Sequence, residues 1–166
     1  MTIILKNKET LIYKNLKFRC SIGKKGIKNK KKEGDKKTPK GIFKLGNLFY
    51  RSDRKDKPKT KLSCIKINKN MGWCDDLKSK KYYNKIINLN KNKTLKHEKL
   101  YRKSFEYNFF IPIKYNTKNR KIGKGSAIFI HLTKNYSSTA GCIAVKEKDF
   151  LKISNMISKN TKIKID

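Results

Sequence analysis

A histidine and a cysteine stand out in the segment IFIHLTKNYSSTAGCIAV, residues 128 to 145, which is the least basic part of a lysine-rich chain. His131 follows an apolar run, and Cys142 comes eleven residues later, directly after a glycine. A cysteine nucleophile needs a base, an exposed position and hydrogen-bond donors for the oxyanion that forms when the sulfur attacks a carbonyl. The segment therefore predicts that Cys142 is a nucleophile and that His131 is its general base.

The turn before the cysteine predicts the oxyanion donors. Gly141 lets the backbone approach a substrate and adopt unusual dihedral angles, so the amides of Gly141 and Cys142 are both expected to point at the oxyanion. The many lysines are expected to favour the thiolate, since nearby cations lower the pKa of a cysteine. The residue types leave an alternative open, in which Cys142 is a buried structural cysteine beside a core histidine. Thr139 likewise either orients the loop or binds substrate, or only completes a turn.

Strand-like segments surround both residues and must position them. Short alternating or apolar runs predict strands at TIIL, TLIY, LKFRCSI, IFKLGNLFYR, KLSCIKI, YNFFIPIKYN, GSAIFIHL and CIAV, with TKIKI as a closing edge strand. MGWCDDLKSKKYYN reads as a structured loop. His131 is then expected at the end of one strand and Cys142 at the start of a neighbouring one.

Helical spacing is confined to two places. Phe150, Ile153 and Ile157 predict a short amphipathic helix, and a weaker helical pattern covers residues 85 to 105. The expected fold is mainly β, with one or two short helices, in a single domain over residues 1 to 166.

The formal net charge of +33 indicates attraction to acidic partners such as nucleic acid, anionic lipid or a wall polymer. Nearly all of this charge is lysine, spread along the whole chain and accompanied by asparagine and isoleucine, which codon bias toward A and T can produce. Dedicated nucleic-acid binders more often cluster arginine, so no specific nucleic-acid partner is predicted. The aromatic content of 10% argues for a folded chain.

The four cysteines show neither a metal-binding nor a disulfide pattern. They lack CxxC spacing, so we predict no metal site, and the chain is large enough to fold without disulfides. The N-terminal apolar run is far shorter than a signal peptide requires, and no stretch approaches the length of a membrane span.

The segment IHL…STAGCIAV resembles the signature of the L,D-transpeptidase catalytic domain, a histidine followed within about a dozen residues by [Ser/Thr]-x-Gly-Cys and an apolar residue. The resemblance extends from about residue 19 to 158. SIGKKGIKNKKKEGDKKTPKGIFKL is similar to the N-terminal half of that domain. MGWCDD, YYN, HE, KYN and GSAIFIHL are similar to the branch of the family that occurs as a stand-alone catalytic domain.

The resemblance implies a mixed β-sandwich or partly closed barrel with the cysteine in a groove. It implies that Cys142 attacks the L-centre carbonyl of diaminopimelate in a donor stem peptide of peptidoglycan and expels the terminal D-Ala. A second stem peptide then captures the acyl-enzyme to give a 3→3 cross-link, or water captures it, as in an L,D-carboxypeptidase. No cofactor is required. We expect a monomer that acts in the cell envelope or periplasm.

One position departs from the family pattern. Many members carry a second histidine directly before the Gly-Cys pair, whereas this chain has Ala140 there. The role of base therefore falls on His131 alone.

Further candidates for substrate binding each have a structural alternative. Trp73, Asp75 and Asp76 are candidates to line the groove, with either carboxylate holding an amine, although a solvated acidic turn explains the aspartates equally well. His97 and Glu98 form either a second polar cluster near the site or a pair on a surface helix. Arg19 either binds a carboxylate of the stem peptide or faces solvent.

Three function hypotheses remain open at this point. The first is a cysteine acyltransferase that acts on peptidoglycan. The second is a hydrolase of the same fold, with water as the acceptor. The third is a basic module that binds a polymer or nucleic acid and carries an inactive site.

Overall fold

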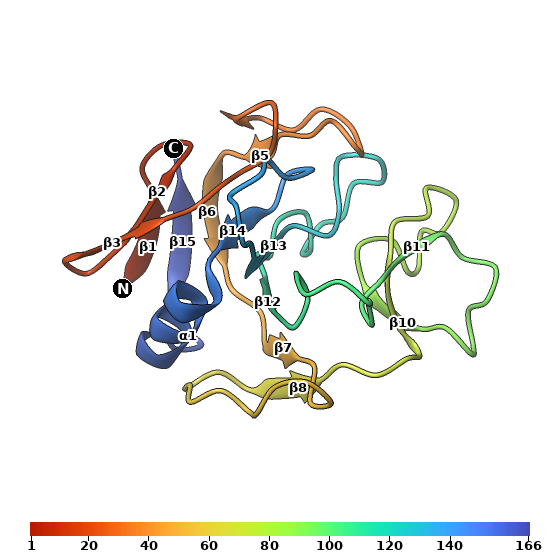
Figure 1. The fold of residues 1–166 in the computed structure, drawn as a ribbon. Coiled ribbons are helices and arrows are strands. Elements are labelled where there is room, and N and C mark those ends of the chain that lie inside the picture. The colour runs from red at the N-terminus through yellow and green to blue at the C-terminus, as the bar shows by residue number, and fades with distance from the viewer.

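The computed structural model describes all residues from 1 to 166 as short strands and one helix (Figure 1). The elements are β1 (Thr2–Leu5), β2 (Thr10–Tyr13), β3 (Leu16–Arg19), β4 (Ile27–Lys28), β5 (Thr38–Pro39), β6 (Gly41–Lys44), β7 (Leu48–Tyr50), β8 (Cys64–Lys66), β9 (Met71–Cys74), β10 (Ile86–Asn88), β11 (His97–Lys99), β12 (Phe109–Pro112), β13 (Phe129–Leu132), β14 (Ile143–Val145), α1 (Glu147–Met156) and β15 (Lys162–Ile165). The mainly β fold with a short helix is confirmed.

Two five-stranded sheets form the body of the protein. One has the order β3-β2-β1-β15-β6 and the other the order β14-β13-β12-β7-β8, and neither closes into a barrel. Figure 1 shows the first sheet beside both chain termini, the second sheet in the middle and the three-stranded sheet β10-β9-β11 on the far side. The short pair β4-β5 is a separate two-stranded sheet, and Figure 1 shows β5 near the upper end of β6.

The main hydrophobic core lies between the two large sheets and α1. In β1 and β15 every second side chain is buried, as the alternation of a strand requires. Ile3 and Ile163 enter the core from the first sheet, Ile130 and Val145 from the second, and Phe150 from α1. A second, smaller cluster lies on the opposite face of the second sheet, and Cys142 belongs to it.

The helix expected in residues 85 to 105 does not exist. This region forms β10 and β11, which pair with the two edges of β9, so MGWC is a strand where a loop was expected. Side chains from both flanking segments pack over Gly72 in β9, where a Cβ atom would lie 2.6 Å from a Leu89 side-chain carbon and 3.0 Å from the His97 ring. These are contacts between distant parts of the chain, which a local pattern does not contain.

Two strand predictions were also wrong in detail. TKIKI forms β15, which is an interior strand, because it pairs in parallel with β1 and in antiparallel with β6. IFKLGNLFYR forms two strands, β6 and β7, which belong to different sheets. The chain bends at Gly46, whose amide donates to the Pro112 carbonyl at 2.8 Å.

No helix is long and apolar enough to cross a lipid bilayer.

Candidate active site

The pairing of β13 with β14 brings His131 and Cys142 to one face of the second sheet. The strands are parallel, with His131 opposite Ala144 and Ile130 opposite Ile143. Side chains alternate along a strand, so Ile130 and Ile143 enter the main core, while His131, Ala144 and Cys142 share the other face. His131 lies within β13 rather than at its end, and Cys142 directly precedes β14, as expected.

A cavity of about 790 Å³ opens over this face of the sheet. Its lining includes both His131 and Cys142, together with the loop of residues 137 to 140 that leads to the cysteine. Carboxylates of Glu33, Asp75 and Glu98 also line it. The two residues predicted to be catalytic therefore face one ligand-sized space.

His131 is oriented as a base. Its Nδ1 lies 2.9 Å from the backbone carbonyl oxygen of Leu132, so we assign the ring proton to Nδ1, where it donates to that oxygen. This tautomer leaves Nε2 unprotonated. Burial lowers the pKa of His131, so the ring is neutral at pH 7.

Cys142 is a thiol in the resting protein. Burial, with a smaller contribution from the nearby Glu98 carboxylate, raises its pKa to about 12, although the Phe129 amide, Arg102 and Lys30 each act to lower it. The Phe129 amide donates to Sγ at 3.3 Å, and the thiol donates to the Ala127 carbonyl, also at 3.3 Å. The expectation that the lysines would favour the thiolate is wrong, because burial outweighs them.

The backbone around Cys142 is held by the Thr139 hydroxyl. This hydroxyl accepts from the Gly141 amide at 3.1 Å and donates to the Cys142 carbonyl at 2.6 Å. The Gly141 amide is therefore occupied, contrary to the expectation of two free oxyanion donors. The Cys142 amide donates to no protein acceptor, so it is the one that remains for a substrate oxygen.

Of the two predicted aspartates, only Asp75 lines the cavity. Its Oδ1 is buried without a hydrogen-bond partner, and its Oδ2 lies 3.9 Å from the Lys96 ammonium. Burial raises the pKa of Asp75. Asp76 instead accepts the amides of Lys78 and Lys96 at 2.9 and 3.1 Å, which makes it a turn residue.

The remaining predicted residues lie outside the cavity lining. Trp73 is buried beneath the site, where its indole packs edge-on against Phe129 at 5.0 Å and donates to Asn84 at 2.9 Å. The Nδ1 of His97 lies 2.7 Å from the carbonyl oxygen of Leu95. Arg19 stacks on the Tyr136 ring at 4.5 Å, beside a separate and smaller hollow.

A cluster of Glu98, Arg102 and Tyr107 lies on the cavity wall, and of these residues the sequence had singled out only Glu98. The Tyr107 hydroxyl and the Arg102 guanidinium both donate to Oε1 of Glu98, and Arg102 also stacks on the Tyr107 ring at 4.1 Å. The Tyr107 ring centroid lies 5.6 Å from that of His131, so the cluster packs against the His131 ring. The dipeptide His97-Glu98 had drawn attention to β11, and of the two residues Glu98 lines the cavity whereas His97 does not.

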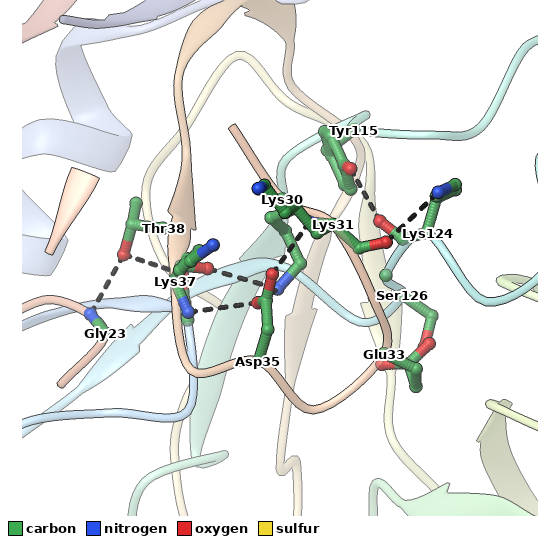
Figure 2. Close-up of polar contacts among 12 residues, drawn as sticks. Gly23, Lys30, Lys31, Glu33, Asp35, Lys37, Thr38, Tyr115, Lys124 and Ser126 are labelled. Atoms are coloured by element: carbon green, nitrogen blue, oxygen red, sulfur yellow. Dashed lines mark hydrogen bonds and ion pairs between the residues drawn. The ribbon is translucent and has the colours of Figure 1, made fainter. Parts of the chain in front are cut away.

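The segment from Lys30 to Thr38 contributes Lys30, Glu33 and Gly34 to another wall of the cavity. Figure 2 shows the polar contacts that hold this segment in place. The buried Asp35 carboxylate accepts from the Lys30 ammonium at 2.5 Å and from the amides of Lys31 and Lys37 at 2.9 and 3.2 Å. Burial alone would raise the pKa of Asp35, but these donors outweigh it and lower the pKa to about 2. The carboxylate therefore remains ionised and fixes the segment.

Glu33, in the same segment, is tied to a different part of the chain. Its carboxylate accepts from the Tyr83 hydroxyl at 2.5 Å and from the Ser126 hydroxyl at 2.9 Å. Ser126 leads into β13, so this contact connects the segment to the strand that carries His131.

Two comparisons with known proteins bear on this site. The family model YkuD, described as the L,D-transpeptidase catalytic domain, matches residues 1–165. A search of curated proteins finds no match to the chain.

No group of three or more histidine, cysteine, aspartate or glutamate side chains is arranged to hold a metal ion.

Proposed function

The chain belongs to the L,D-transpeptidase catalytic domain family, which acts on peptidoglycan stem peptides, and from this premise we propose that it cross-links those peptides through an acyl-enzyme on Cys142. The observation that carries the proposal is that a neutral His131 and the Cys142 thiol share one face of the second sheet and one cavity. The proposal treats residues 1 to 166 as one catalytic domain that acts as a monomer in the cell envelope, without a cofactor or a specific nucleic-acid partner.

Acylation begins with a neutral pair. As Sγ of Cys142 attacks the carbonyl carbon at the L-centre of diaminopimelate, its proton passes to Nε2 of His131. The carbonyl oxygen becomes an oxyanion, which the free Cys142 amide stabilises. When the tetrahedral intermediate collapses, the bond to the terminal D-Ala breaks, and the imidazolium of His131 returns the proton to the departing amine.

Deacylation repeats these steps in reverse with a different amine. The side-chain amine of a second stem peptide attacks the thioester, His131 accepts its proton, and the Cys142 thiol leaves protonated. The product is a 3→3 cross-link. Water in place of the amine gives a tripeptide, which is the hydrolytic alternative.

The cavity contains a group suited to hold the acceptor. Oδ1 of Asp75 is buried without a partner, and an N–H of the acceptor amine would satisfy it as a donor. The Lys96 ammonium is 3.9 Å from the other oxygen and 73% exposed, so it neutralises Asp75 only weakly. This observation favours transfer to an amine over hydrolysis.

The direct test of the reaction is to incubate the purified protein with disaccharide tetrapeptide and analyse the products by mass spectrometry. Cross-linked dimers that have lost one D-Ala support transfer, and tripeptide alone replaces transfer with hydrolysis. Cys142→Ala and His131→Ala are the controls and should give neither product. Absence of product from folded wild-type protein, together with steeply salt-dependent binding to duplex DNA, would favour the binding-module hypothesis instead.

A further inference from the structure

Thr38 is a fully buried residue of β5 whose hydroxyl bridges two backbone groups. Its Oγ1 accepts from the Gly23 amide at 2.9 Å and donates to the Gly141 carbonyl at 2.9 Å. The direction of both bonds is fixed, because an amide can only donate and the hydroxyl has a single proton. Figure 2 shows Thr38 directed at Gly23, with Lys37 between it and Asp35.

The bond to Gly141 determines the direction of the Cys142 amide. The Gly141 carbonyl and the Cys142 N–H belong to the same peptide group, which is planar and trans, so the two point in opposite directions. Thr38 holds the carbonyl toward β5, and the amide therefore points away from β5. This amide is the one that donates to no protein acceptor.

No other side chain holds this peptide group. Thr139 fixes the peptide that follows Cys142, through the Cys142 carbonyl, and the amide of the peptide that precedes Gly141. Gly141 has a φ of +140° and no side chain of its own to restrict rotation. The peptide between Gly141 and Cys142 thus depends on the Thr38 hydroxyl.

We propose that Thr38 is a positioning residue for the oxyanion hole: it holds the Gly141–Cys142 peptide so that the Cys142 amide faces the developing oxyanion. The proposal rests on the proposed function, because the oxyanion belongs to the acyl-transfer reaction. Thr38 does not line the cavity and does not touch the substrate.

The test compares two reactions of the same sulfur. Acylation of Cys142 by a carbapenem passes through an oxyanion, whereas alkylation by iodoacetamide displaces iodide and forms none. Thr38→Val keeps the shape of the side chain but removes the hydroxyl, so it should slow acylation by about tenfold to a hundredfold. Alkylation of Cys142, followed by peptide mapping, should remain at the wild-type rate, and Thr38→Ser should restore acylation.

A matched control comes from Thr60, which has the same bonding pattern far from the cysteine. Its hydroxyl accepts from the Leu62 amide at 3.1 Å and donates to the Ser154 carbonyl at 2.6 Å. Thr60→Val therefore loses the same two kinds of bond and should change neither rate. An equal loss of both rates in Thr38→Val would show a general structural role and overturn the proposal, as would acylation at the wild-type rate.

A second variant and a measurement without substrate keep the role of Thr38 testable if Thr38→Val does not fold or if the wild type is not acylated. If Thr38→Val does not fold, Thr38→Ala replaces it, and it should lower acylation more than alkylation. The backbone ¹³C′ chemical shift of Gly141 should move in the variant and recover in Thr38→Ser, and an unchanged shift would contradict the proposal. This shift is measured without any substrate, so failure of wild-type acylation would count against the proposed function and not against the role of Thr38 on this peptide.

Discussion

The backbone carbonyl oxygen of Lys37 lies 2.8 Å from the position that a Cβ atom on Gly141 would occupy. The turn that presents Cys142 is thus packed directly against the backbone of the segment that leads into β5. The shape of the nucleophile turn depends on a part of the chain about a hundred residues earlier, which Asp35 and Thr38 hold in place.

Gly141→Ala is expected to disrupt this contact. The φ of +140° is unfavourable for a residue with a side chain, and the new Cβ would contact backbone that cannot easily move. We expect a loss of about 1–3 kcal/mol in the free energy of unfolding and at least a tenfold slower acylation. Denaturant titration and carbapenem acylation kinetics measure the two effects. Gly123→Ala is the control, since Gly123 also has a positive φ but the nearest atom, a Leu77 side-chain carbon, lies 3.9 Å from the added Cβ. Similar acylation rates in both variants would show that the contact at Gly141 does not matter for acylation.

The pH dependence of Cys142 acylation and alkylation should reflect a resting state in which His131 and Cys142 are both neutral. Burial lowers the pKa of His131, so the acylation rate should rise with pH through an apparent pKa below about 6.5 and then remain high at neutral pH. The pKa of Cys142 is about 12, so the rate of its alkylation by iodoacetamide should still rise at about pH 10. An alkylation rate that levels off near neutral pH would show a stable thiolate and contradict the neutral pair.

Asp35→Asn should destabilise the protein, because it leaves the buried Lys30 ammonium without its counter-ion. Removing one partner of a buried ion pair typically costs about 3–5 kcal/mol. The pKa of Asp35 falls from 3.8 to about 2 on folding, so its contribution is fully present above about pH 4 and is lost as the pH falls toward 2.

Urea unfolding at several pH values tests this prediction. The difference in stability between wild type and Asp35→Asn should be constant near neutral pH and shrink in the acid range. A difference that stays the same down to pH 2, or one that grows there, would be inconsistent with an ionised Asp35 in the folded protein.

Asp75→Asn should affect the acceptor half of the reaction. Removal of the charge is expected to raise the KM for the acceptor stem peptide by about tenfold and to shift products from cross-linked dimer toward tripeptide, with little change in the first acylation step. Asp76→Asn is the matched control, because Asp76 caps a turn outside the cavity lining. Equal product ratios in the two variants would remove Asp75 from the acceptor site.

The sequence predicted most of the strands, and it predicted that His131 and Cys142 lie on neighbouring strands, because both depend on local patterns. Alternation along β15 and the apolar runs of β1 and β13 are visible in the residues themselves, and the spacing of His131 and Cys142 fits two neighbouring strands joined by a loop. The interior position of β15 was missed because it results from a parallel pairing with β1, at the other end of the chain.

The surroundings of the site were harder to predict, since distant segments supply them. Glu98 and Tyr107 reach the cavity that His131 lines because β11 pairs with β9 and β12 pairs with β13. The pKa of Cys142 was predicted in the wrong direction because the lysine count describes the whole chain, whereas burial and the nearest carboxylate act at the sulfur. The bridging role of Thr38 requires a bond across more than a hundred residues.

The most direct test of the central claim is the mass of the protein after incubation with a carbapenem, a β-lactam of the class that acylates this family. Attack by Cys142 opens the β-lactam ring and leaves the whole molecule attached, so wild type should gain one adduct mass. Cys142→Ala retains Cys20, Cys64 and Cys74 and should gain none. Unmodified wild-type protein that is demonstrably folded, or an equal adduct on Cys142→Ala, would contradict the claim that Cys142 is the acyl-accepting nucleophile.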